Sequence, residues 1–458
     1  MAQNRQDMGS GPVKPLLLQL MIPAVVAQVV NLLYNIVDRI YIGHIEGIGA
    51  AALTGVGLFA PILMLLNAFA MLIGAGGAPR TAIALGQDNK DEAEKIIGNS
   101  FTMLLFFAVV LTAGFYAGAP ALLRLFGASD ATLPYAVAYG RIYILGSVFV
   151  LLVMGMNPFI TTQGFAKISM LTTVIGAVIN IILDPILIFG LGWGVRGAAV
   201  ATVLSQVASA VLTLRCIVGS QGMPWHIRTE KLRLHGDVFA AICTIGVPAA
   251  AQSAMYNISN MFIQSSMNSF GTSTIAAWGV YGKIDFLFWM TINSLGIAIT
   301  TFAGQNFGAR QYDRVRRGVR VCLAMAACTT LVISFTFYNL AEVLFRLFSQ
   351  DDAVVAVGVG MMHVLTPVYI TYVCIEVLAG ALRGCGDVRV PTLITVFFVC
   401  GLRMLWLFIA VPIRHEVATV EMSYPITWSL ASALFILYYV KGGWMQRCAE
   451  KWEKNQAG

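Results

Sequence analysis

Charged residues are scarce in this chain of 458 residues, and their scarcity excludes an ordinary soluble domain. Only 11% of the residues are Asp, Glu, Lys or Arg, whereas 58% are hydrophobic, and a soluble domain usually carries about 25% charged residues. The apolar residues come in repeated blocks, each long enough for the roughly 20 residues with which a helix crosses a bilayer. The composition therefore indicates an integral membrane protein whose partner is the lipid bilayer.

The motifs that accompany catalysis, metal binding and nucleotide binding are missing as well. The eight cysteines are scattered without a CxxC pair, which argues against a disulfide framework or a zinc site. His415-Glu416 lacks the second histidine of HExxH, and no Walker loop offers a site for ATP. Since no nucleophile and base occur in a recognisable arrangement, we expect neither an enzyme nor a bound cofactor or resident metal.

Twelve apolar segments, separated by polar turns or turns with Gly and Pro, predict an all-α integral membrane protein with twelve transmembrane helices. The predicted spans cover approximately 15–42, 50–78, 94–118, 133–158, 164–190, 196–218, 237–268, 273–304, 314–340, 354–380, 388–412 and 420–441.

Lys and Arg are distributed unequally between the two sides of these spans. The termini and every second loop carry 21 of the 29 basic residues, the other side carries 4, and the remaining four lie inside spans. Basic residues accumulate on the cytoplasmic side of membrane proteins, so both termini are predicted to be cytoplasmic. The same bias accounts for the net charge of +7 without nucleic acid as a partner.

An internal repeat links the two halves of the chain. The segment "IPAVVAQVVNLLYNIVD", from residue 22, matches "VPAAAQSAMYNISNMFI", from residue 247, and pairs Pro23 with Pro248 and Asn35 with Asn260. Two later matches keep the same order: "LGQDNKDEA" (85–93) with "FGARQYDRV" (307–315), and "LFGASD" (125–130) with "LFSQDD" (347–352).

The repeat predicts two six-helix lobes. Six spans is an even number, so both halves enter the membrane from the same side as parallel repeats, related by a pseudo-twofold axis along the membrane normal. Such halves place the substrate between them. We predict an N-terminal lobe at 1–218, a cytoplasmic linker at 219–236 and a C-terminal lobe at 237–458.

Polar residues form a stripe on the first span. Gln28, Asn31, Asn35 and Asp38 are spaced by three or four residues and therefore lie on one helical face. A polar stripe on a membrane helix must face protein or water. Ionisable residues within spans are costly and mark functional sites, so Asp38 is a candidate site residue.

Other polar residues reach the depth of Asp38. Asn180 and Asp184 lie one turn apart in the fifth span, and Thr202 and Gln206 begin the sixth. At about 1.5 Å per residue, Asp38, Asn180, Asp184 and Thr202 converge in the outer half of the bilayer. Their oxygens suit a small cation such as Na⁺. Alternatively, the acid pair binds a proton, since burial beside a like charge favours the protonated carboxyl, or the group forms interhelical hydrogen bonds.

The C-terminal half differs in its chemistry. Asp38 is opposite Ile263, so the acid is not repeated. The bases and acids of this half either pair with each other or contact substrate, and its aromatic and Met residues can line a cavity for apolar cations. The candidate cavity residues are Tyr34, Tyr143, Asn157, Tyr256, Asn260, Lys283, Asp285, Trp289, Tyr369, Tyr372 and Glu376. Arg403 and Lys283 are the two bases that lie within the spans of this half.

The twelve spans in two parallel halves, the early "IP…N…VD" span and the paired "LGQ" and "FGA" loops resemble the MATE (multidrug and toxic compound extrusion) family over about 15–440. Within this resemblance, Asp38, Asn180, Asp184 and Thr202 are similar to the N-lobe cation-site residues of the DinF-like branch, which includes MepA-type pumps. Ala198 falls where that branch offers a backbone contact. The acid that the NorM branch carries early in the seventh span is missing here.

The resemblance implies a cation-coupled antiporter that exports amphipathic, often cationic drugs by alternating access. The transported ion is H⁺ or Na⁺, and the protein is expected to be a monomer in the bacterial inner membrane. A flippase of lipid-linked oligosaccharide, or of another lipid, with a similar helix layout is the alternative hypothesis. Its anionic cargo favours an Arg-rich cavity, whereas this N-terminal half offers two carboxylates.

Overall fold

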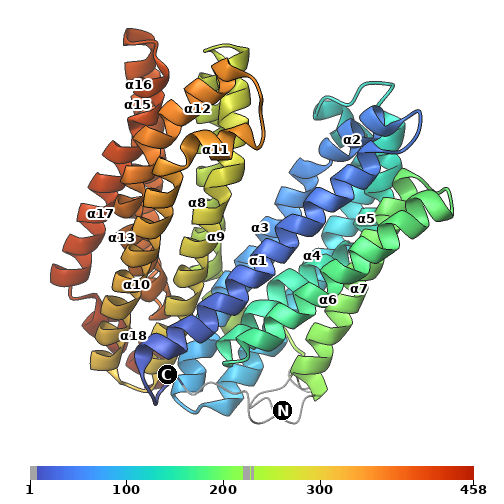
Figure 1. Ribbon diagram of the computed structural model, residues 1–458. Coiled ribbons are helices and arrows are strands. Elements are labelled where there is room, and N and C mark those ends of the chain that lie inside the picture. Colours follow the sequence, from blue (N-terminus) through green and yellow to red (C-terminus); the bar gives the residue numbers. More distant parts are fainter. Residues whose placement is uncertain (1–7, 220–226, 228–231, 458) are drawn as a thin grey trace. The chain divides into compact units, whose positions relative to one another are not determined.

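Helices make up the ordered structure of the protein (Figure 1). The computed structural model describes residues 8–219, 227 and 232–457, and none of these lies in a strand. Twelve helical segments are long and apolar enough to cross a membrane, and they match the twelve predicted spans to within a few residues at most ends. The all-α membrane fold is thus confirmed, while most of the predicted linker 219–236 lies outside the described residues.

Several spans are built from more than one helical element. The elements up to residue 219 are α1 (Val13–Gly43), α2 (Gly49–Gly57), α3 (Ala60–Gly86), α4 (Lys90–Leu125), α5 (Leu133–Thr162), α6 (Ala166–Pro185), the π-helix η2 (Ile186–Gly190) and α7 (Val195–Gly219).

The later elements include three α-helices of five or six residues (α11, α14 and α16) and a C-terminal helix, none of which the sequence predicted as a separate unit. They are α8 (Gly236–Asn268), α9 (Thr272–Gly308), α10 (Tyr312–Asn339), α11 (Ala341–Arg346), α12 (Asp352–Leu365), the 3-10 helix η4 (Thr366–Val368), α13 (Tyr369–Gly384), α14 (Arg389–Ile394), the π-helix η5 (Thr395–Gly401), α15 (Leu402–Ile413), α16 (Val417–Glu421), α17 (Ser423–Lys441) and α18 (Trp444–Ala457).

The chain falls into two compact units whose boundaries lie inside helices. Residues 22–250 belong to the first unit, and residues 8–21 together with 251 onward belong to the second. Both α1 and α8 are therefore shared between units, and the paired prolines Pro23 and Pro248 lie next to the two points of division. Proline removes a backbone hydrogen bond from a helix interior, so each shared helix changes unit close to a weakened turn.

Buried asparagines fix the chain just before each shared helix. In the second unit, the carbonyl oxygen of Met8 accepts hydrogen bonds from Asn306 Nδ2 at 3.0 Å and Arg314 Nε at 3.1 Å. In the first unit, Asn99 Oδ1 accepts the backbone N–H of His235 at 2.8 Å. These bonds satisfy main-chain groups that lie outside any helix, and they tie the entry to α1 and α8 to neighbouring helices.

The repeat is visible in the turns that follow the second span of each half. Asp88 and Arg310, which lie 222 residues apart, are the described non-glycine residues with positive φ, at 54° and 58°. In both turns the next residue, Asn89 or Gln311, donates its N–H to a carbonyl of the preceding helix, at 3.0 and 2.8 Å. The matched sequence blocks therefore fold into the same left-handed turn.

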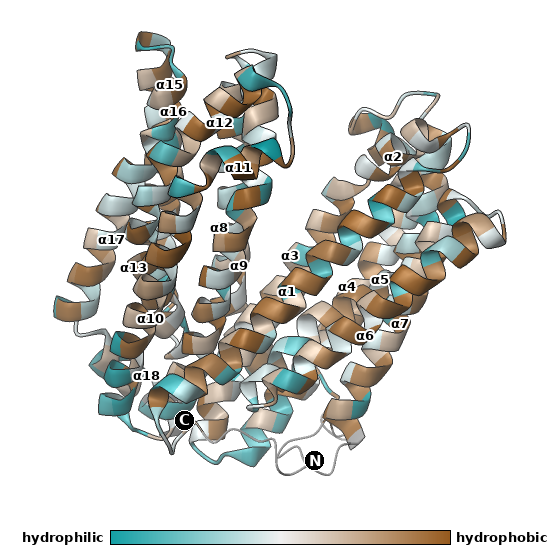
Figure 2. Ribbon diagram, viewed as in Figure 1, coloured by the Kyte–Doolittle hydropathy of each residue, from teal (hydrophilic) through white to brown (hydrophobic). Residues whose placement is uncertain are grey.

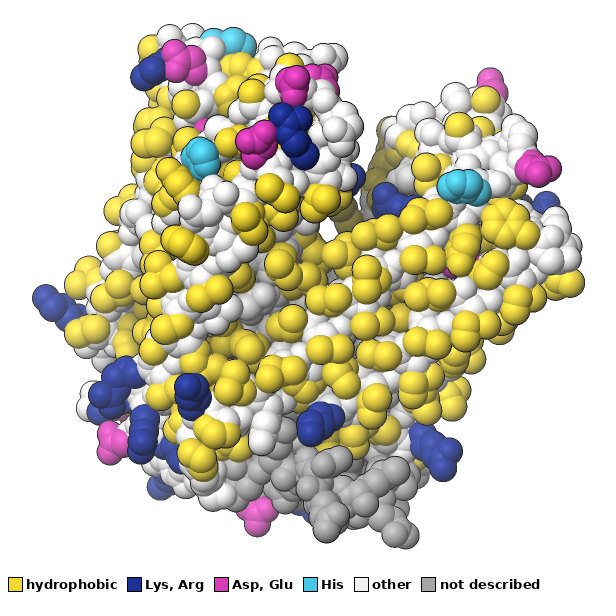
Figure 3. All heavy atoms as spheres, in the orientation of Figure 1, with side chains coloured by type: hydrophobic (Ala, Val, Ile, Leu, Met, Phe, Trp, Pro, Cys, Tyr) yellow, Lys and Arg dark blue, Asp and Glu magenta, His cyan; other side chains and the backbone are white. Residues whose placement is uncertain are grey.

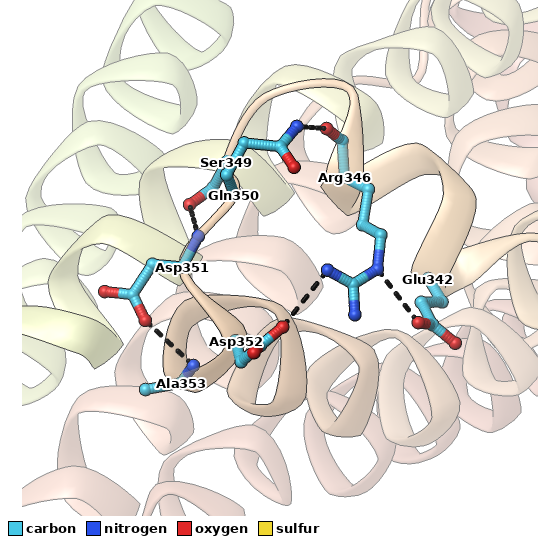
Figure 4. Close-up of polar contacts among 7 residues, drawn as sticks. All are labelled: Glu342, Arg346, Ser349, Gln350, Asp351, Asp352 and Ala353. Carbon is cyan, nitrogen blue, oxygen red and sulfur yellow. Dashed lines mark hydrogen bonds and ion pairs between the residues drawn. The ribbon is translucent and has the colours of Figure 1, made fainter.

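An ion pair also occurs in both halves with the offset of 222 residues. It lies at the helix ends opposite to the left-handed turns. Arg346 donates to Glu342 at 3.0 Å and to Asp352 at 3.1 Å, which ties α11 to the start of α12 (Figure 4). In the other half, Arg124 lies 3.6 Å from Asp130. The "LFSQDD" and "LFGASD" blocks thus share a structural ion pair as well as a sequence pattern.

Apolar side chains cover the lengths of the helices. Figure 2 shows hydrophobic residues along the spans and hydrophilic ones mainly near their ends, and Figure 3 shows charged side chains gathered mostly at the same ends on the visible face. Large apolar residues such as Val109 and Phe335 are 70% and 73% exposed. Such a surface suits lipid, because no backbone polar group of a helix needs water there.

Small residues let helices of the first unit approach closely. A Cβ added to Gly155 on α5 would lie 2.6 Å from the side chain of Leu104 on α4, and one on Gly76 of α3 would lie 2.5 Å from the carbonyl oxygen of Ile242 on α8. Close backbone approach through small residues is how membrane helices gain packing energy.

We predict that Gly246→Ala lowers the melting temperature of the purified protein in detergent. A Cβ at this position would overlap the carbonyl of Leu72 on α3, and overpacking of this kind costs about 1–3 kcal/mol. The matched control is Gly114→Ala in α4, where a Cβ meets nothing within 4 Å. Equal melting temperatures for both variants would contradict the assigned packing.

Candidate functional site

Three helices of the first unit bring the predicted cation-site residues together. Asp38 comes from α1, Asn180 and Asp184 from α6, and Thr202 from α7. Pro185 ends the α-helical part of this span, and the chain continues as the π-helix η2. A π-helix within a membrane span widens the turn and often occurs at functional sites, and here it begins two residues after Asp184.

The site is buried and connected by hydrogen bonds. Asn180 and Asp184 are fully buried, and Thr202 and Asp38 are 6% and 9% exposed. Asn180 Nδ2 donates to Asp184 Oδ1 at 3.4 Å and to Thr202 Oγ1 at 3.5 Å. The carboxyl groups of Asp38 and Asp184 lie within hydrogen-bonding reach of one another. Depth along the predicted spans therefore located a real cluster.

The backbone carbonyl of Ala198 also belongs to the cluster. Ala198 is fully buried on α7, and its oxygen accepts a hydrogen bond from Thr202 Oγ1 at 3.0 Å. Ala198 lies inside α7, so the same oxygen also accepts a backbone N–H from four residues further along the helix, and the bond from Thr202 completes its two acceptor positions.

Three oxygens of the site lack a partner among the described residues. They are Asp38 Oδ1, Asn180 Oδ1 and Asp184 Oδ2, and all three are buried. An unsatisfied buried acceptor costs about 1–3 kcal/mol, and more where it is charged. A shared proton or a small cation satisfies such oxygens, whereas an anion would add to their repulsion. The cluster therefore offers acceptor oxygens of the kind that a cation or a proton binds.

Tyrosines from α1 and α5 surround the carboxyls. Tyr34 lies close enough to interact electrostatically with both acids. Tyr139 lies close enough to interact electrostatically with Asp38, and its ring stacks on Tyr143 at 5.8 Å between centroids. Tyr139 was not predicted as a site residue. Its position four residues before the candidate Tyr143 was the signal available in the sequence.

The polar stripe of α1 does not enter the site as a whole. Asn35 is exposed, and its amide donates to the carbonyl of Asn31 on its own helix at 2.7 Å. Gln28 and Asn31 are half-buried along α1, and Gln206 is half-buried on α7. Asp38 is thus the member of the stripe that the structure brings to the acid of α6.

Asn157, a candidate cavity residue of the first unit, forms hydrogen bonds with a neighbouring helix. Asn157 on α5 donates to Thr172 and Thr173 on α6, both at 3.2 Å. These are hydrogen bonds between helices, which the sequence left open as an alternative role for polar residues in spans.

The acid of α9 is held by aromatic donors. Tyr369 Oη donates to Asp285 Oδ1 at 2.5 Å, and Trp289 Nε1 donates to Asp285 Oδ2 at 2.6 Å. Lys283 is exposed and lies with its ammonium 5.5 Å from the ring centroid of Phe348. Asp285 is therefore stabilised by hydrogen bonds and not by the lysine two residues away.

The acid of α13 pairs with an arginine that the sequence placed in a loop. Glu376 lies 3.5 Å from Arg383 and accepts a hydrogen bond from Tyr372 Oη at 3.4 Å. Tyr372 in turn contacts Tyr256 through their hydroxyls at 3.2 Å. Asn260 is exposed on α8, away from this chain of bonds.

Arg403 is buried against aromatic rings. It is 2% exposed, and its guanidinium carbon lies 4.3 Å from the ring centroid of Tyr424 and 5.8 Å from that of Trp428. Such cation–π contacts replace part of the lost hydration. The two bases and two acids of this half therefore find separate partners among the described residues and do not neutralise each other.

Comparison with known proteins gives the family. The MatE family model matches residues 23–186 and again 248–409, so its two copies begin at the two prolines that the internal repeat pairs. The chain is 25% identical to "Probable multidrug resistance protein YoeA" of Bacillus subtilis over 430 residues, which covers 92% of each chain. It is 24% identical to the "FAD transporter" of Shewanella oneidensis over 358 residues, covering 77% of this chain and 78% of the relative.

The fold also matches a solved structure described as the outward-facing conformation of a multidrug resistance MATE family transporter of the MOP superfamily. The TM-score is 0.87 at 22% identity, with 97% of both chains covered. The two matched segments span most of the chain and reproduce its internal repeat. The chain belongs to the MatE family and is a membrane transporter, as its resemblance to the MATE transporters implied.

Proposed function

We propose that the protein exports amphipathic, often cationic compounds in exchange for H⁺ or Na⁺, and that the ion binds at Asp38 and Asp184. The observation that carries this proposal is the set of three buried oxygens without partners, two of which belong to adjacent carboxyls. Binding of one positive charge satisfies these oxygens and removes the repulsion between the two acids.

Coupling follows if the ion and the exported compound favour different conformations. A ligand shifts a conformational equilibrium only by the difference between its affinities for the two states. Asp38 is on α1, one of the two helices that the compact units share, while Asp184 is on α6 within the first unit. Any change in α1 that separates these carboxyls lowers the affinity for the ion, so ion binding and the position of α1 are linked.

The exported compound is proposed from the charge of the first unit and from the relatives. Two buried carboxyls favour cations over anions, and one relative is named a multidrug resistance protein. The relative named as an FAD transporter handles an anionic compound, so cargo varies among related proteins. Membership in the MatE family favours export of small molecules over flipping of lipid-linked oligosaccharide.

The orientation and assembly are also part of the proposal. We propose that the protein resides in a bacterial inner membrane with both termini in the cytoplasm, an orientation that the excess of Lys and Arg on one side supports. In that orientation the ion enters the site from outside the cell, and the exported compound leaves to the outside. We propose that a single chain performs the cycle.

We predict that Asp38→Asn and Asp184→Asn each abolish coupled export. The amide keeps the size of the side chain but cannot carry the negative charge that holds the ion, so transport into proteoliposomes and drug resistance of cells should both fall to the level of empty controls. Asp130→Asn is the matched control, because Asp130 has a fully exposed side chain in a surface ion pair with Arg124.

Protein amount and melting temperature should be measured beside transport, so that loss of fold is distinguished from loss of coupling. Unchanged resistance in cells that express a folded Asp38→Asn variant would defeat the assignment of the site.

We predict that Thr202→Val distinguishes the two ions. The hydroxyl oxygen is a ligand for Na⁺ but does not carry the transported proton. Its loss should raise the half-maximal Na⁺ concentration about tenfold, or about 1.4 kcal/mol, in a Na⁺-driven protein, and change the rate of a H⁺-driven one by about twofold or less. Transport in proteoliposomes under a Na⁺ gradient and under a pH gradient gives the measurement. A variant that loses transport under both gradients would show that Thr202 maintains the structure of the site.

A further inference from the structure

A recess opens at the end of the second unit where α10, α17 and α18 meet. Its volume is about 450 Å³, and its lining includes Arg316 and Arg320 of α10, Tyr439 and Val440 of α17, and Trp444 of α18. These helix ends lie on the membrane side that carries most of the Lys and Arg residues. The recess is separate from the cation site, which belongs to the first unit.

The two arginines bring uncompensated positive charge to this recess. They are four residues apart on α10, so they lie on the same helical face, where like charges repel. Arg316 lies 3.5 Å from Asp313, but both side chains are largely exposed, and such pairs contribute little. Within the part of the chain that the structure describes, Arg320 has no carboxylate partner. An anion in the recess would relieve the repulsion.

Acidic residues of neighbouring elements already have partners. Asp387 accepts a hydrogen bond from Tyr438 Oη at 2.5 Å, and the same hydroxyl accepts one from Arg447 at 3.0 Å. Glu453 of α18 lies 3.3 Å from Arg310. These pairs engage Asp387 and Glu453, and among the described residues no ion pair joins Glu450, the other acid of α18, to Arg316 or Arg320.

A tyrosine hydroxyl adds a hydrogen-bonding group without a partner. The Oη of Tyr439 is buried, and it has no hydrogen bond among the described residues. The turn that holds this side chain is well defined, because Trp444 Nε1 donates to the carbonyl of Tyr439 at 3.0 Å and the two rings lie 5.3 Å apart. Gly443 makes the turn with φ of +57°, which glycine adopts without strain.

The recess continues into an apolar surface. Val440, in its lining, is 71% exposed, and Leu437 and Ile436 on the preceding turn of α17 are 52% and 46% exposed. A ligand that fills both parts must carry an anionic group beside a long apolar one. Tyr and Trp side chains gather at membrane–water interfaces, and basic pockets between membrane helices bind lipid headgroups.

We propose that this recess binds an anionic phospholipid, with its phosphate between Arg316, Arg320 and the hydroxyl of Tyr439 and its acyl chains along the exposed side of α17. The phosphate of the lipid compensates the positive charge of the two arginines, and its acyl chains contact the exposed side chains of Val440 and Leu437. Free phosphate meets only the first requirement.

The test compares the full-length protein with Arg316→Gln/Arg320→Gln in detergent, titrated with phosphatidylglycerol, with phosphatidylcholine or with inorganic phosphate. Lipid retention is read by native mass spectrometry and stabilisation by the melting temperature. We expect the wild-type protein to retain phosphatidylglycerol in preference to phosphatidylcholine, and the double variant to bind it about 30-fold more weakly, since each basic residue near a lipid surface contributes about a factor of five.

The control variant is Arg317→Gln/Lys441→Gln, which removes the same charge from exposed residues at the same ends of α10 and α17 but outside the recess lining. Equal loss in both double variants would show general electrostatic attraction and overturn the proposal. The proposal would also be overturned if the wild-type protein retained the two lipids equally. The same holds if inorganic phosphate raised the melting temperature as much as phosphatidylglycerol does. A weaker preference for phosphatidylglycerol in Tyr439→Phe, with unchanged melting temperature without lipid, would support the assigned hydrogen bond.

Discussion

A carboxylate inside an apolar helix bundle is stable only where another group or an ion shares its charge, and this constraint organises the first unit. Asp38 and Asp184 approach from different helices, with Asn180 and Thr202 completing the hydrogen bonds around them. The protein supplies fewer donors than these oxygens can accept. In a purely structural cluster this shortage would be a net cost, whereas in the proposed mechanism it is the source of affinity for a positive charge that enters and leaves.

Two acids of the second unit meet the same constraint in a different way. Asp285 receives two short hydrogen bonds from Tyr369 and Trp289, and Glu376 has Arg383 as its ion-pair partner. Each of these acids is supplied with donors from its own unit, so a cation has less to gain there. The two halves therefore share turn geometry and loop ion pairs, which depend on the backbone, but differ in the chemistry of their interiors, where Asp38 has Ile263 as its counterpart.

Sequence reasoning succeeded where a single variable decides the outcome. Hydropathy fixes the twelve spans, and depth along a span, at about 1.5 Å per residue, was enough to bring Asp38, Asn180, Asp184 and Thr202 together. Sequence reasoning failed where the rotation of a helix about its axis, or the residue at which a helix ends, determines which side chains meet. Tyr139 was missed because depth does not say which face of α5 points to the site. Arg383 was assigned to a loop, but α13 continues to Gly384 and brings this arginine within an ion-pair distance of Glu376.

The position of Asp38 on a shared helix connects the chemistry of the site to the architecture. Residues 13–21 of α1 pack with the second unit and residues 22–43 with the first, and Pro23 lies at the change. Asp38 is 15 residues beyond Pro23, or about 22 Å along a helix. Asp38 is therefore carried by a helix that is preceded by a segment of the second unit, which Asn306 and Arg314 fix at Met8. Asp184 has no such connection. In the proposed mechanism, a change at the start of α1 is therefore expected to alter the spacing of the two acids, and with it the affinity for the ion.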